Sequence, residues 1–422
     1  MVMKILFLDQ SGQLGGAELC LADIAQYFSK SHDENCDESR DESRDESRGQ
    51  KSNETCLVGV FESGNFPDYL RQRKISVSIL ATQPLQVRKQ SGLLTGLKNL
   101  NRLIPLIKTV VQLSQTYDLI YANTQKALVV GVIASYFSRT PLVYHLHDIV
   151  SPEHFSRLNR QIIITLANQA ALVIANSEAS RSAFLAAGGR AKRVQVVYNG
   201  FDLSRYQTAA KSRLKLRAEL GLADKFVVGH FSRLSPWKGQ HVLIEALQYC
   251  SSEVIAIFVG SDLFKESDYV QQLKQQIEAL GLGDRVKFLG FRSDIPELMS
   301  ACDLIAHTST AAEPFGRVIV EGMLCDRPVV AAAAGGALEI IEYSQNEHGQ
   351  EHGQENSQGH SQTGWLTPPG DVLKLAAAIQ AVYQDPQAAG EIARRGQQRA
   401  QQRFGLKETH AQINRLIKTA IN

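Results

Sequence analysis

What the sequence lacks excludes several classes of protein. Its six cysteines include no Cys-x-x-Cys pair and no histidine at zinc-finger spacing, so we expect neither a disulfide scaffold nor a structural zinc site. No apolar run reaches the ~20 residues that a membrane-spanning helix needs, and the apolar stretch near the first residue is too short for a signal peptide. We therefore expect a cytoplasmic protein.

The sequence also lacks a strong net charge. It carries 45 Lys and Arg residues against 43 Asp and Glu residues, a formal charge of +2, which argues against binding of nucleic acid over a large surface. Apolar residues make up 44% and charged residues 21%, as in ordinary soluble globular proteins. Its 422 residues are too many for one compact core and favour two domains.

Two polar repeats interrupt the chain. Residues 37–48 read DESR three times, and residues 348–362, within an insertion at 344–362, read HGQEHGQENSQGHSQ. Neither repeat has an apolar face that could offset the entropy lost on ordering. We interpret both as disordered insertions in surface loops. Metal capture by the three histidines of the second repeat is the alternative.

Elsewhere, short apolar strands alternate with helical patterns in two series. This alternation predicts an α/β protein of two doubly wound parallel sheets, with the ligand in the cleft beyond the carboxyl ends of their strands. We expect one domain over residues 1–202, a second over 203–403, and a final helix at 404–422 that packs back on the first domain. The expected strands are residues 4–9, 55–60, 75–80, 118–121, 141–147, 171–175 and 194–198, then 226–231, 254–259, 285–289, 303–307 and 328–332.

The loop after the first strand reads DQSGQLGGAE, residues 9–18. It lacks Gly-x-Gly-x-x-Gly, which argues against a nicotinamide cofactor. Gly15 and Gly16 lie just before a helix, where bare backbone N–H groups and the positive helix end attract anions. The loop is therefore either a phosphate site or a tight turn.

The second series begins with a strand that is followed by SRLSPWKG. Arg233 and Lys238 lie in this loop, and two cations at the carboxyl end of a strand suit a diphosphate. A solvated surface pair is the alternative.

The segment EPFGRVIVEGML places two acids eight residues apart, Glu313 in a loop and Glu321 within a helix. One carboxylate could bind a sugar hydroxyl and the other a ribose. The N–H groups at the helix start point along the helix dipole and could bind a phosphate. These N–H groups belong to Gly316, Arg317 and Val318. Two ordinary surface glutamates are the alternative.

This segment resembles the Glu-x7-Glu signature of the retaining glycosyltransferases of family four, the group 1 glycosyl transferases with the GT-B fold. Further similar motifs occur in the family's order: GGAE, YHLHD, VVYNGFD, SRLSPWKG, VKFLGFRSDIPELMSACDL, AAAAGGALEII and GWLTPPGD. The resemblance covers the chain outside the two repeats. It implies two Rossmann-like domains that face a central cleft.

The resemblance also implies residue roles in the second domain. Arg233 and Lys238 would neutralise the diphosphate leaving group. Glu313 would bind the donor sugar and Glu321 the ribose, while residues around Arg292 would meet the base through their backbone.

In the first domain, the resemblance implies that Gly16 lets the backbone close over the phosphate. The family's active-site histidine precedes an acid, which favours His147. His145 lies two residues earlier on the same strand face and remains the alternative.

The activity implied is transfer of a hexose from a nucleoside diphosphate sugar to a glycan or lipid-linked acceptor in polysaccharide biosynthesis. UDP is favoured over GDP as the nucleotide, and no separate cofactor is expected. The sequence has no Asp-x-Asp, so we expect no metal ion. Retention is attributed in this family to front-face attack. An inactive member that binds a partner and a GT-B sugar-nucleotide epimerase are the alternatives.

The segment between Tyr69 and Tyr117 has no acidic residue. Leucine, isoleucine and valine recur in it at helical spacing. It is either a core-facing helix with a solvated basic side or a surface that docks on anionic lipid at the inner face of a membrane. Its eight basic residues are Arg71, Arg73, Lys74, Arg88, Lys89, Lys98, Arg102 and Lys108.

Overall fold

The computed structural model describes residues 3–36, 55–81, 93–207, 213–261, 267–341 and 362–421, without the side chains of residues 31–36, 93–102 and 267. The repeat at 37–48, the insertion up to residue 361, and Arg88 and Lys89 lie outside the described residues. The side chains of Lys98 and Arg102 lie outside them as well. The chain divides into two units, residues 1–198 with 407–422, and residues 199–406.

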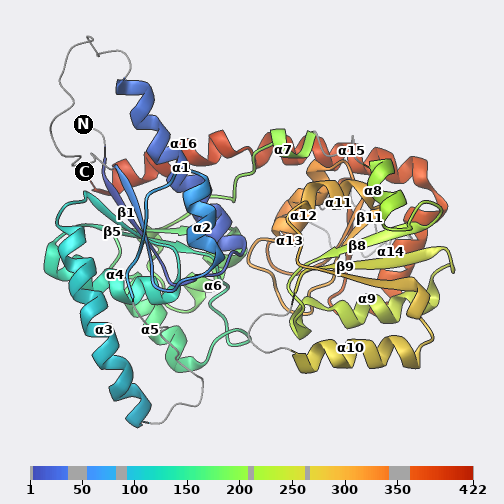
Figure 1. Cartoon of the computed structure of the whole chain (residues 1–422), viewed down its shortest axis with the longest axis horizontal. Coiled ribbons are helices and arrows are strands. Elements are labelled where there is room, and N and C mark those ends of the chain that lie inside the picture. Colours follow the sequence, from blue (N-terminus) through green and yellow to red (C-terminus); the bar gives the residue numbers. More distant parts are fainter. Residues whose placement is uncertain are drawn as a thin grey trace, which may run out of the picture. The chain divides into compact units, whose positions relative to one another are not determined.

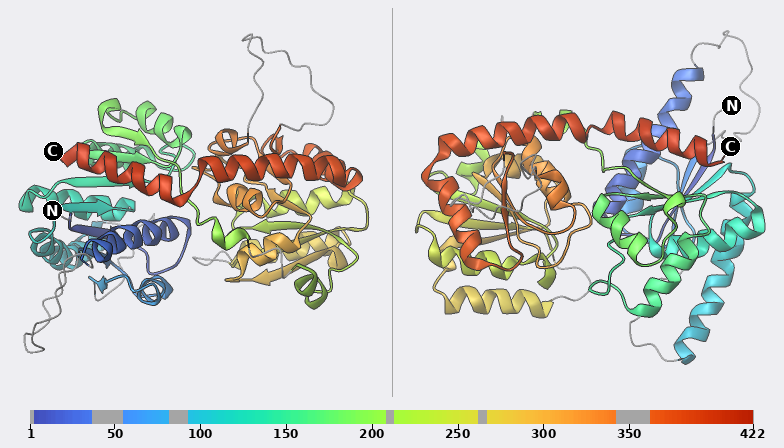
Figure 2. Two further views of the ribbon diagram at one scale, coloured as in Figure 1. Left: turned by 90° about the horizontal axis from the view of Figure 1, so that it is seen from above. Right: turned by 180° about the vertical axis from the view of Figure 1, so that it is seen from behind.

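The described residues of the first unit form a seven-stranded parallel sheet with helices on both faces (Figures 1 and 2). The strand order is β3-β2-β1-β4-β5-β6-β7. The strands are β1 (Ile5–Asp9), β2 (Cys56–Val60), β3 (Val77–Ile79), β4 (Leu119–Ala122), β5 (Leu142–Leu146), β6 (Leu172–Ala175) and β7 (Val194–Val196). The helices are α1 (Gly16–Cys36), α2 (Asn65–Gln72), α3 (Leu93–Ser114), α4 (Gln125–Ser138), α5 (Arg157–Ala167), α6 (Glu178–Ala186) and α16 (Leu406–Ile421).

Strand β1 contributes to a hydrophobic core on each face of this sheet. Its alternate residues Ile5 and Phe7 pack with α1, α2 and α16, whereas Leu6 and Leu8 pack with α3, α4 and α5. Successive side chains of a strand point to opposite faces, so a strand covered on both faces is apolar throughout. Polar side chains of such a strand are then expected at its carboxyl end, where the loops begin.

The described residues of the second unit form a six-stranded parallel sheet in the order β10-β9-β8-β11-β12-β13. The strands are β8 (Phe226–Phe231), β9 (Val254–Val259), β10 (Val286–Gly290), β11 (Leu304–His307), β12 (Val329–Ala332) and β13 (Trp365–Thr367). Helices α9, α10 and α14 share one core over this sheet. The helices are α7 (Ser204–Gln207), α8 (Arg213–Glu219), α9 (Gln240–Ala246), α10 (Ser267–Ala279), α11 (Ile295–Ala301), α12 (Arg317–Leu324), α13 (Ala337–Ile340), α14 (Val372–Gln384) and α15 (Pro386–Arg403).

The expected fold class, two Rossmann-like parallel-sheet units, is confirmed. Each expected strand lies within two residues of its expected limits. Strand β13 was not expected, because its three residues follow directly on the polar insertion. No helix in the described ranges is both long and apolar enough to cross a membrane.

Candidate functional site

In the second unit, the loops after β8 and β11 meet through an ion pair. Lys238 Nζ lies 2.9 Å from Glu313 Oε1 and 2.7 Å from Oε2. The two side chains are only 16% and 15% exposed. Because β8 and β11 are neighbours in the sheet, the loops at their carboxyl ends are adjacent, although the paired residues are 75 positions apart. Lys238 Nζ also lies 4.1 Å from the centre of the Trp237 ring.

Two glycines allow these loops to approach closely. Gly239 has a φ of 72°, and a Cβ there would lie 1.9 Å from the carbonyl oxygen of Thr308. Gly335 has a φ of 62°, and a Cβ there would lie 2.1 Å from the carbonyl oxygen of Glu313. Other residues would clash at both positions and would strain the backbone. The GG of AAAAGGALEII therefore shapes the loop that carries Glu313.

The Glu313 carboxylate has two further polar neighbours. Ser309 Oγ donates to Glu313 Oε2 over 3.1 Å, and His307 Nε2 lies 3.5 Å from the same atom. Burial alone would raise the pKa of Glu313, but the Lys238 ammonium and His307 outweigh it and hold this pKa well below its usual range. Glu313 is therefore an ionised carboxylate. His307 and Ser309 were not predicted as site residues, although polar residues at the end of the apolar strand β11 could have indicated them.

Helix α12 places Glu321 beside Arg317 rather than beside Glu313. Arg317 Nη2 lies 3.4 Å from Glu321 Oε1, one turn along the helix. The Arg317 guanidinium also covers the Phe201 ring at 4.5 Å from its centre. Gly316 caps the helix with a φ of 101°, and Val318 follows Arg317 in the first turn. Only the backbone N–H of Arg317 was expected to take part in the site. The structure shows in addition that its side chain contacts Glu321 and Phe201.

The other two basic candidates of this unit lie in different loops. Arg233 is half-buried in the loop after β8, where its carbonyl oxygen accepts a hydrogen bond of 2.9 Å from Gln240. Arg292 follows β10 and forks onto Asp294 through bonds of 2.8 and 2.6 Å. The hydrogen bond and charge of Asp294 raise the pKa of Arg292. In the described part of this unit, Arg292 therefore pairs with Asp294 and not with Glu313.

In the first unit, polar side chains from three adjacent strand ends form a hydrogen-bonded chain. Asn123 Nδ2 donates to Asp9 Oδ2 over 2.7 Å, and Asn123 Oδ1 lies 2.9 Å from His147 Nε2. Asp9 ends β1, Asn123 follows β4 and His147 follows β5. Asp9 and Asn123 were not predicted from the sequence, because their contact depends on the pairing of strands far apart in the chain.

The two candidate histidines differ in environment. His145 is 2% exposed, and its Nδ1 lies 2.8 Å from the hydroxyl of Tyr121. Burial, with a smaller contribution from His147, holds the pKa of His145 well below its usual range. His147 is half-buried, and its ring stacks on that of His145 with the centres 4.0 Å apart.

Gly15 and Gly16 lie at the start of α1, next to a buried acid. A Cβ on Gly15 would lie 2.7 Å from Glu18 Oε2. Burial raises the pKa of Glu18, and hydrogen bonds from the backbone of Glu18, the Ser11 side chain and the Gly15 backbone oppose this shift. The expected anion site thus has a carboxyl group beside it, which was not predicted.

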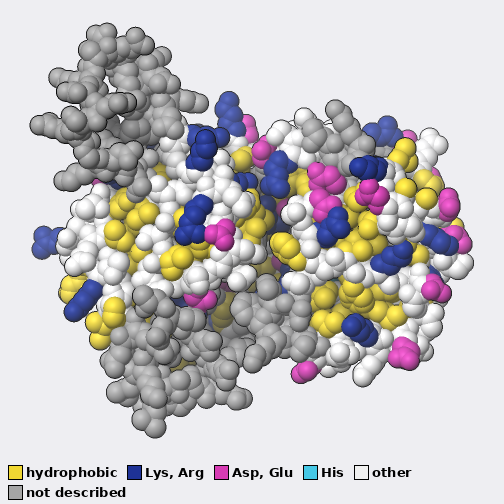
Figure 3. Space-filling view, viewed as in Figure 1, with side chains coloured by type: hydrophobic (Ala, Val, Ile, Leu, Met, Phe, Trp, Pro, Cys, Tyr) yellow, Lys and Arg dark blue, Asp and Glu magenta, His cyan; other side chains and the backbone are white. Residues whose placement is uncertain are grey.

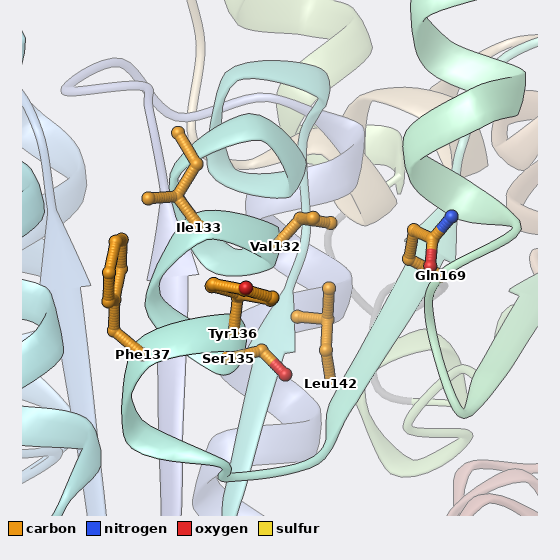
Figure 4. A pocket seen from close by; sticks show the side chains of 7 residues that line it. All are labelled: Val132, Ile133, Ser135, Tyr136, Phe137, Leu142 and Gln169. Carbon is orange, nitrogen blue, oxygen red and sulfur yellow. The ribbon is translucent and has the colours of Figure 1, made fainter.

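A pocket of about 500 Å³ lies elsewhere in the first unit (Figure 4). Five of its lining residues belong to α4, among them Tyr136 and Phe137, and the others are Leu142 and Gln169. Leu142 is the first residue of β5, so the pocket lies at the opposite end of this strand from His147. None of the candidate site residues lines it.

Two family models match the chain. The model of the group 1 glycosyl transferases matches residues 212–402, and the model of glycosyltransferase family 4 matches residues 64–205. Crystal structures of Anabaena HepE with UDP-glucose, and with UDP and glucose, are 51% identical to the chain. They cover 99% of this chain and 100% of theirs, with a TM-score of 0.83.

Curated relatives match over shorter segments. Spore coat protein SA of Bacillus subtilis is 33% identical over 36% of this chain and 44% of its own length. D-inositol 3-phosphate glycosyltransferase of Salinispora arenicola is 29% identical over 53% of this chain and 55% of its own length. The chain thus spans about half the length of these curated relatives. Sucrose-phosphate synthase of Thermosynechococcus elongatus, 19% identical over 99% of this chain and 98% of its own, shares the fold with a TM-score of 0.76.

Proposed function

The chain belongs to the group 1 glycosyl transferases of family four, and we propose that it transfers a hexose from a nucleoside diphosphate sugar to a glycan or lipid-linked acceptor. The observation that carries the proposal is the buried pair of Lys238 and Glu313. A cation and a carboxylate held together at the carboxyl ends of parallel strands offer one group for a diphosphate and one for sugar hydroxyls.

UDP-glucose is the first donor to test. HepE, which matches the chain over its full length, is described in complex with UDP-glucose and with UDP. This likeness supports UDP over GDP as the nucleotide. Glu321 would then bind the ribose, with Arg317 fixing its orientation, and residues around Arg292 would contact the base through their backbone.

Donor binding would redistribute the charges of the Lys238–Glu313 pair. Each side chain now compensates the charge of the other, and both are largely shielded from water. A diphosphate that approached Lys238 and Arg233 would attract the ammonium. Glu313 would then accept hydrogen bonds from hydroxyl groups of the sugar. The leaving diphosphate gains negative charge in the transition state. Cations that already lie at this position lower the activation barrier, because the protein needs little reorganisation during the reaction.

We propose a retaining, metal-independent reaction. The acceptor oxygen bonds to the anomeric carbon on the face from which the diphosphate leaves, and its proton passes to an oxygen of that leaving diphosphate. Arg233, Lys238 and the N–H groups at the start of α12, from Gly316 to Val318, take the role that a divalent cation has in other glycosyltransferases. Gly15 and Gly16 would contact the donor phosphate through their backbone.

His147 is the histidine that we assign to the transferred sugar. Its ring is half-buried and follows the end of β5, whereas His145 lies within the strand and is paired with Tyr121. The lowered pKa of His145 keeps that ring neutral, so it supports a packing role for His145.

We also propose peripheral association with an anionic membrane at its cytoplasmic face, where a lipid-linked acceptor would lie. Two cations of the basic segment are engaged elsewhere, since Arg71 pairs with Asp68 and Arg73 with Asp23, each at 2.6 Å. Lys108 is exposed on α3. The buried residues of the apolar stripe, including Leu106 and Val110, pack in the core and do not face outward.

An exposed aromatic pair on the neighbouring helix favours the same association. Tyr136 and Phe137 of α4 are 81% and 66% exposed, and aromatic side chains of this kind suit the boundary between water and lipid. Figure 3 shows basic and acidic side chains interspersed on the visible face of each unit.

A thermal-shift screen with nucleoside diphosphates tests donor binding directly. UDP should raise the melting temperature more than GDP, because a ligand that binds only the folded state stabilises it. Release of UDP from UDP-glucose, with transfer to an acceptor, would exclude an inactive member, and retention of the sugar's configuration at C2 and C4 would exclude an epimerase. The proposal fails if no nucleoside diphosphate shifts the melting temperature.

A further inference from the structure

The hydrogen bonds around Asn123 leave its amide one orientation. Nδ2 lies 2.7 Å from Asp9 Oδ2 and 3.2 Å from the carbonyl oxygen of Ala17. The Ala17 carbonyl can only accept a hydrogen bond, so the amide nitrogen and not the amide oxygen must face it. Asn123 is 1% exposed, and a reversed amide would place two acceptors against each other without water to compensate.

This orientation determines which nitrogen of His147 carries the proton. Asn123 Oδ1 faces His147 Nε2 at 2.9 Å, and a carbonyl oxygen can only accept. Nε2 must therefore donate. In the neutral imidazole, Nδ1 is then the nitrogen with the lone pair.

Asp9 lies at the other end of this series of hydrogen bonds. This residue is fully buried at the end of β1, and its Oδ1 accepts a hydrogen bond of 2.7 Å from the backbone of Ser11. Its two oxygens thus have separate donors, the Ser11 N–H and the Asn123 amide. An asparagine at this position could accept only one of the two bonds.

We propose that Asp9 and Asn123 are positioning residues that hold His147 in the Nε2–H tautomer with a fixed ring orientation. His147 stacks on His145 and precedes Asp148, which is held by Gln125 at 2.9 Å. The stacked ring of His145 fixes the place of His147, and the hydrogen-bonded relay of Asp9, Asn123 and His147 fixes which ring nitrogen carries the proton. The consequence for catalysis rests on the proposed function: Nδ1 would accept a hydrogen bond from a hydroxyl of the transferred sugar.

The tautomer can be measured directly in protein labelled with ¹⁵N-histidine, because the protonated and unprotonated ring nitrogens have distinct NMR shifts. The His147→Gln spectrum identifies the signals of His147. Wild-type protein at neutral pH should show Nε2–H and an unprotonated Nδ1. Asp9→Asn should weaken the anchoring of the Asn123 amide and raise the population of the Nδ1–H form. Asn123→Leu should leave the two tautomers mixed.

Asn176→Leu is the matched control. Asn176 follows β6 as Asn123 follows β4, is 3% exposed, and accepts a hydrogen bond of 2.9 Å from Ser180. The substitution removes a buried amide of the same kind, so it should lower the melting temperature without changing the tautomer of His147. If the tautomer of His147 also changed in this control, a general loss of rigidity in the first unit, and not the hydrogen bonds of Asp9 and Asn123, would determine it.

Kinetics give a second readout. Asp9→Asn should lower kcat for UDP-glucose by about 10- to 100-fold with little change in KM, the scale expected when a reacting geometry is loosened. The inference is overturned if wild-type His147 carries its proton on Nδ1, which can be observed even if both variants fail to fold. It is also overturned if folded Asp9→Asn and Asn123→Leu keep the wild-type tautomer. If the tautomer responds but UDP-glucose is not a substrate, the relay stands and the proposed function fails.

Discussion

Lys238 and Glu313 form a bidentate ion pair between two loops that the sequence separates by 75 residues. Taking two charges out of water is costly, and their mutual attraction offsets that cost only while both partners are present. Removing one partner should therefore have two consequences: the remaining charge lowers the stability, and the contact that we propose between the missing group and the donor is lost.

Glu313→Gln and Lys238→Met should each lower kcat by at least ~100-fold, because we propose that both groups stabilise the donor in the transition state. Each single variant should also lose about 3 kcal/mol of stability, because it leaves a shielded charge uncompensated. The double variant should regain most of that stability and none of the activity. Steady-state kinetics and urea denaturation measure the two effects separately.

Glu253→Gln is the control for these variants. Glu253 pairs with Lys225 at 3.0 Å, but the side chains are 50% and 42% exposed, and such surface pairs contribute about 0–1 kcal/mol. This variant should retain activity and stability. Near-normal turnover in both Glu313→Gln and Lys238→Met would show that this pair is not part of the active site.

Activity should survive EDTA. The charge of the leaving diphosphate is assigned to Arg233, Lys238 and the start of α12, and none of these groups needs a metal ion. The measurement is the initial rate of UDP release after dialysis against EDTA, with and without added Mg²⁺ or Mn²⁺. Complete loss of activity that either ion restores would contradict metal independence.

His410 should make stability depend on pH. It lies on α16, 5% exposed, with its ring 4.8 Å from that of Tyr27. Burial lowers its pKa to about 4, and the opposing effect of Asp23 is smaller. The unfolded state, with a histidine pKa near 6.5, therefore binds more protons between about pH 4 and 6.5, so stability falls as the pH falls through this window.

The variant His410→Phe isolates this contribution. It keeps an aromatic ring against Tyr27 and removes the titrating group. From pH 7 to pH 5, wild-type protein should lose about 2 kcal/mol more than the variant. Urea denaturation at the two pH values measures the difference. Equal losses in the two proteins would show that His410 does not resist protonation in the folded state.

Strands were predictable because a parallel sheet covered on both faces needs continuous apolar segments, and β1 and β9 are such segments. The residues near Glu313 were predicted only in part. Lys238 was identified as a cation in a loop, but its contact with Glu313 depends on the adjacency of β8 and β11. His307 and Ser309 join the group for the same reason. Local sequence carries no signal for which strand lies beside which.

The first unit shows the same limit more strongly. Because side chains alternate along a strand, His145 and His147 were predicted to lie on the same face of the sheet, and their rings do stack. Strand β5 ends at Leu146, however, so the two histidines differ in burial, and sequence alone does not fix that boundary. Asp9 and Asn123 are single polar residues after apolar strands. Their connection to His147 appears only when β1, β4 and β5 lie side by side.

The protein should bind anionic membranes through the first unit. It should sediment with vesicles that contain anionic lipid and should not bind neutral vesicles. Rising salt should release it, because the attraction of surface cations extends only about 8–10 Å at physiological ionic strength.

Replacing the exposed pair Tyr136 and Phe137 by serine should weaken binding at every salt concentration, since salt does not screen the insertion of apolar side chains. Tyr249→Ser, which removes a 54% exposed aromatic residue from the second unit, is the control and should bind as wild type. If wild-type protein stays in the supernatant with anionic vesicles at low salt, the basic segment is only a solvated surface, and a soluble acceptor becomes the better hypothesis.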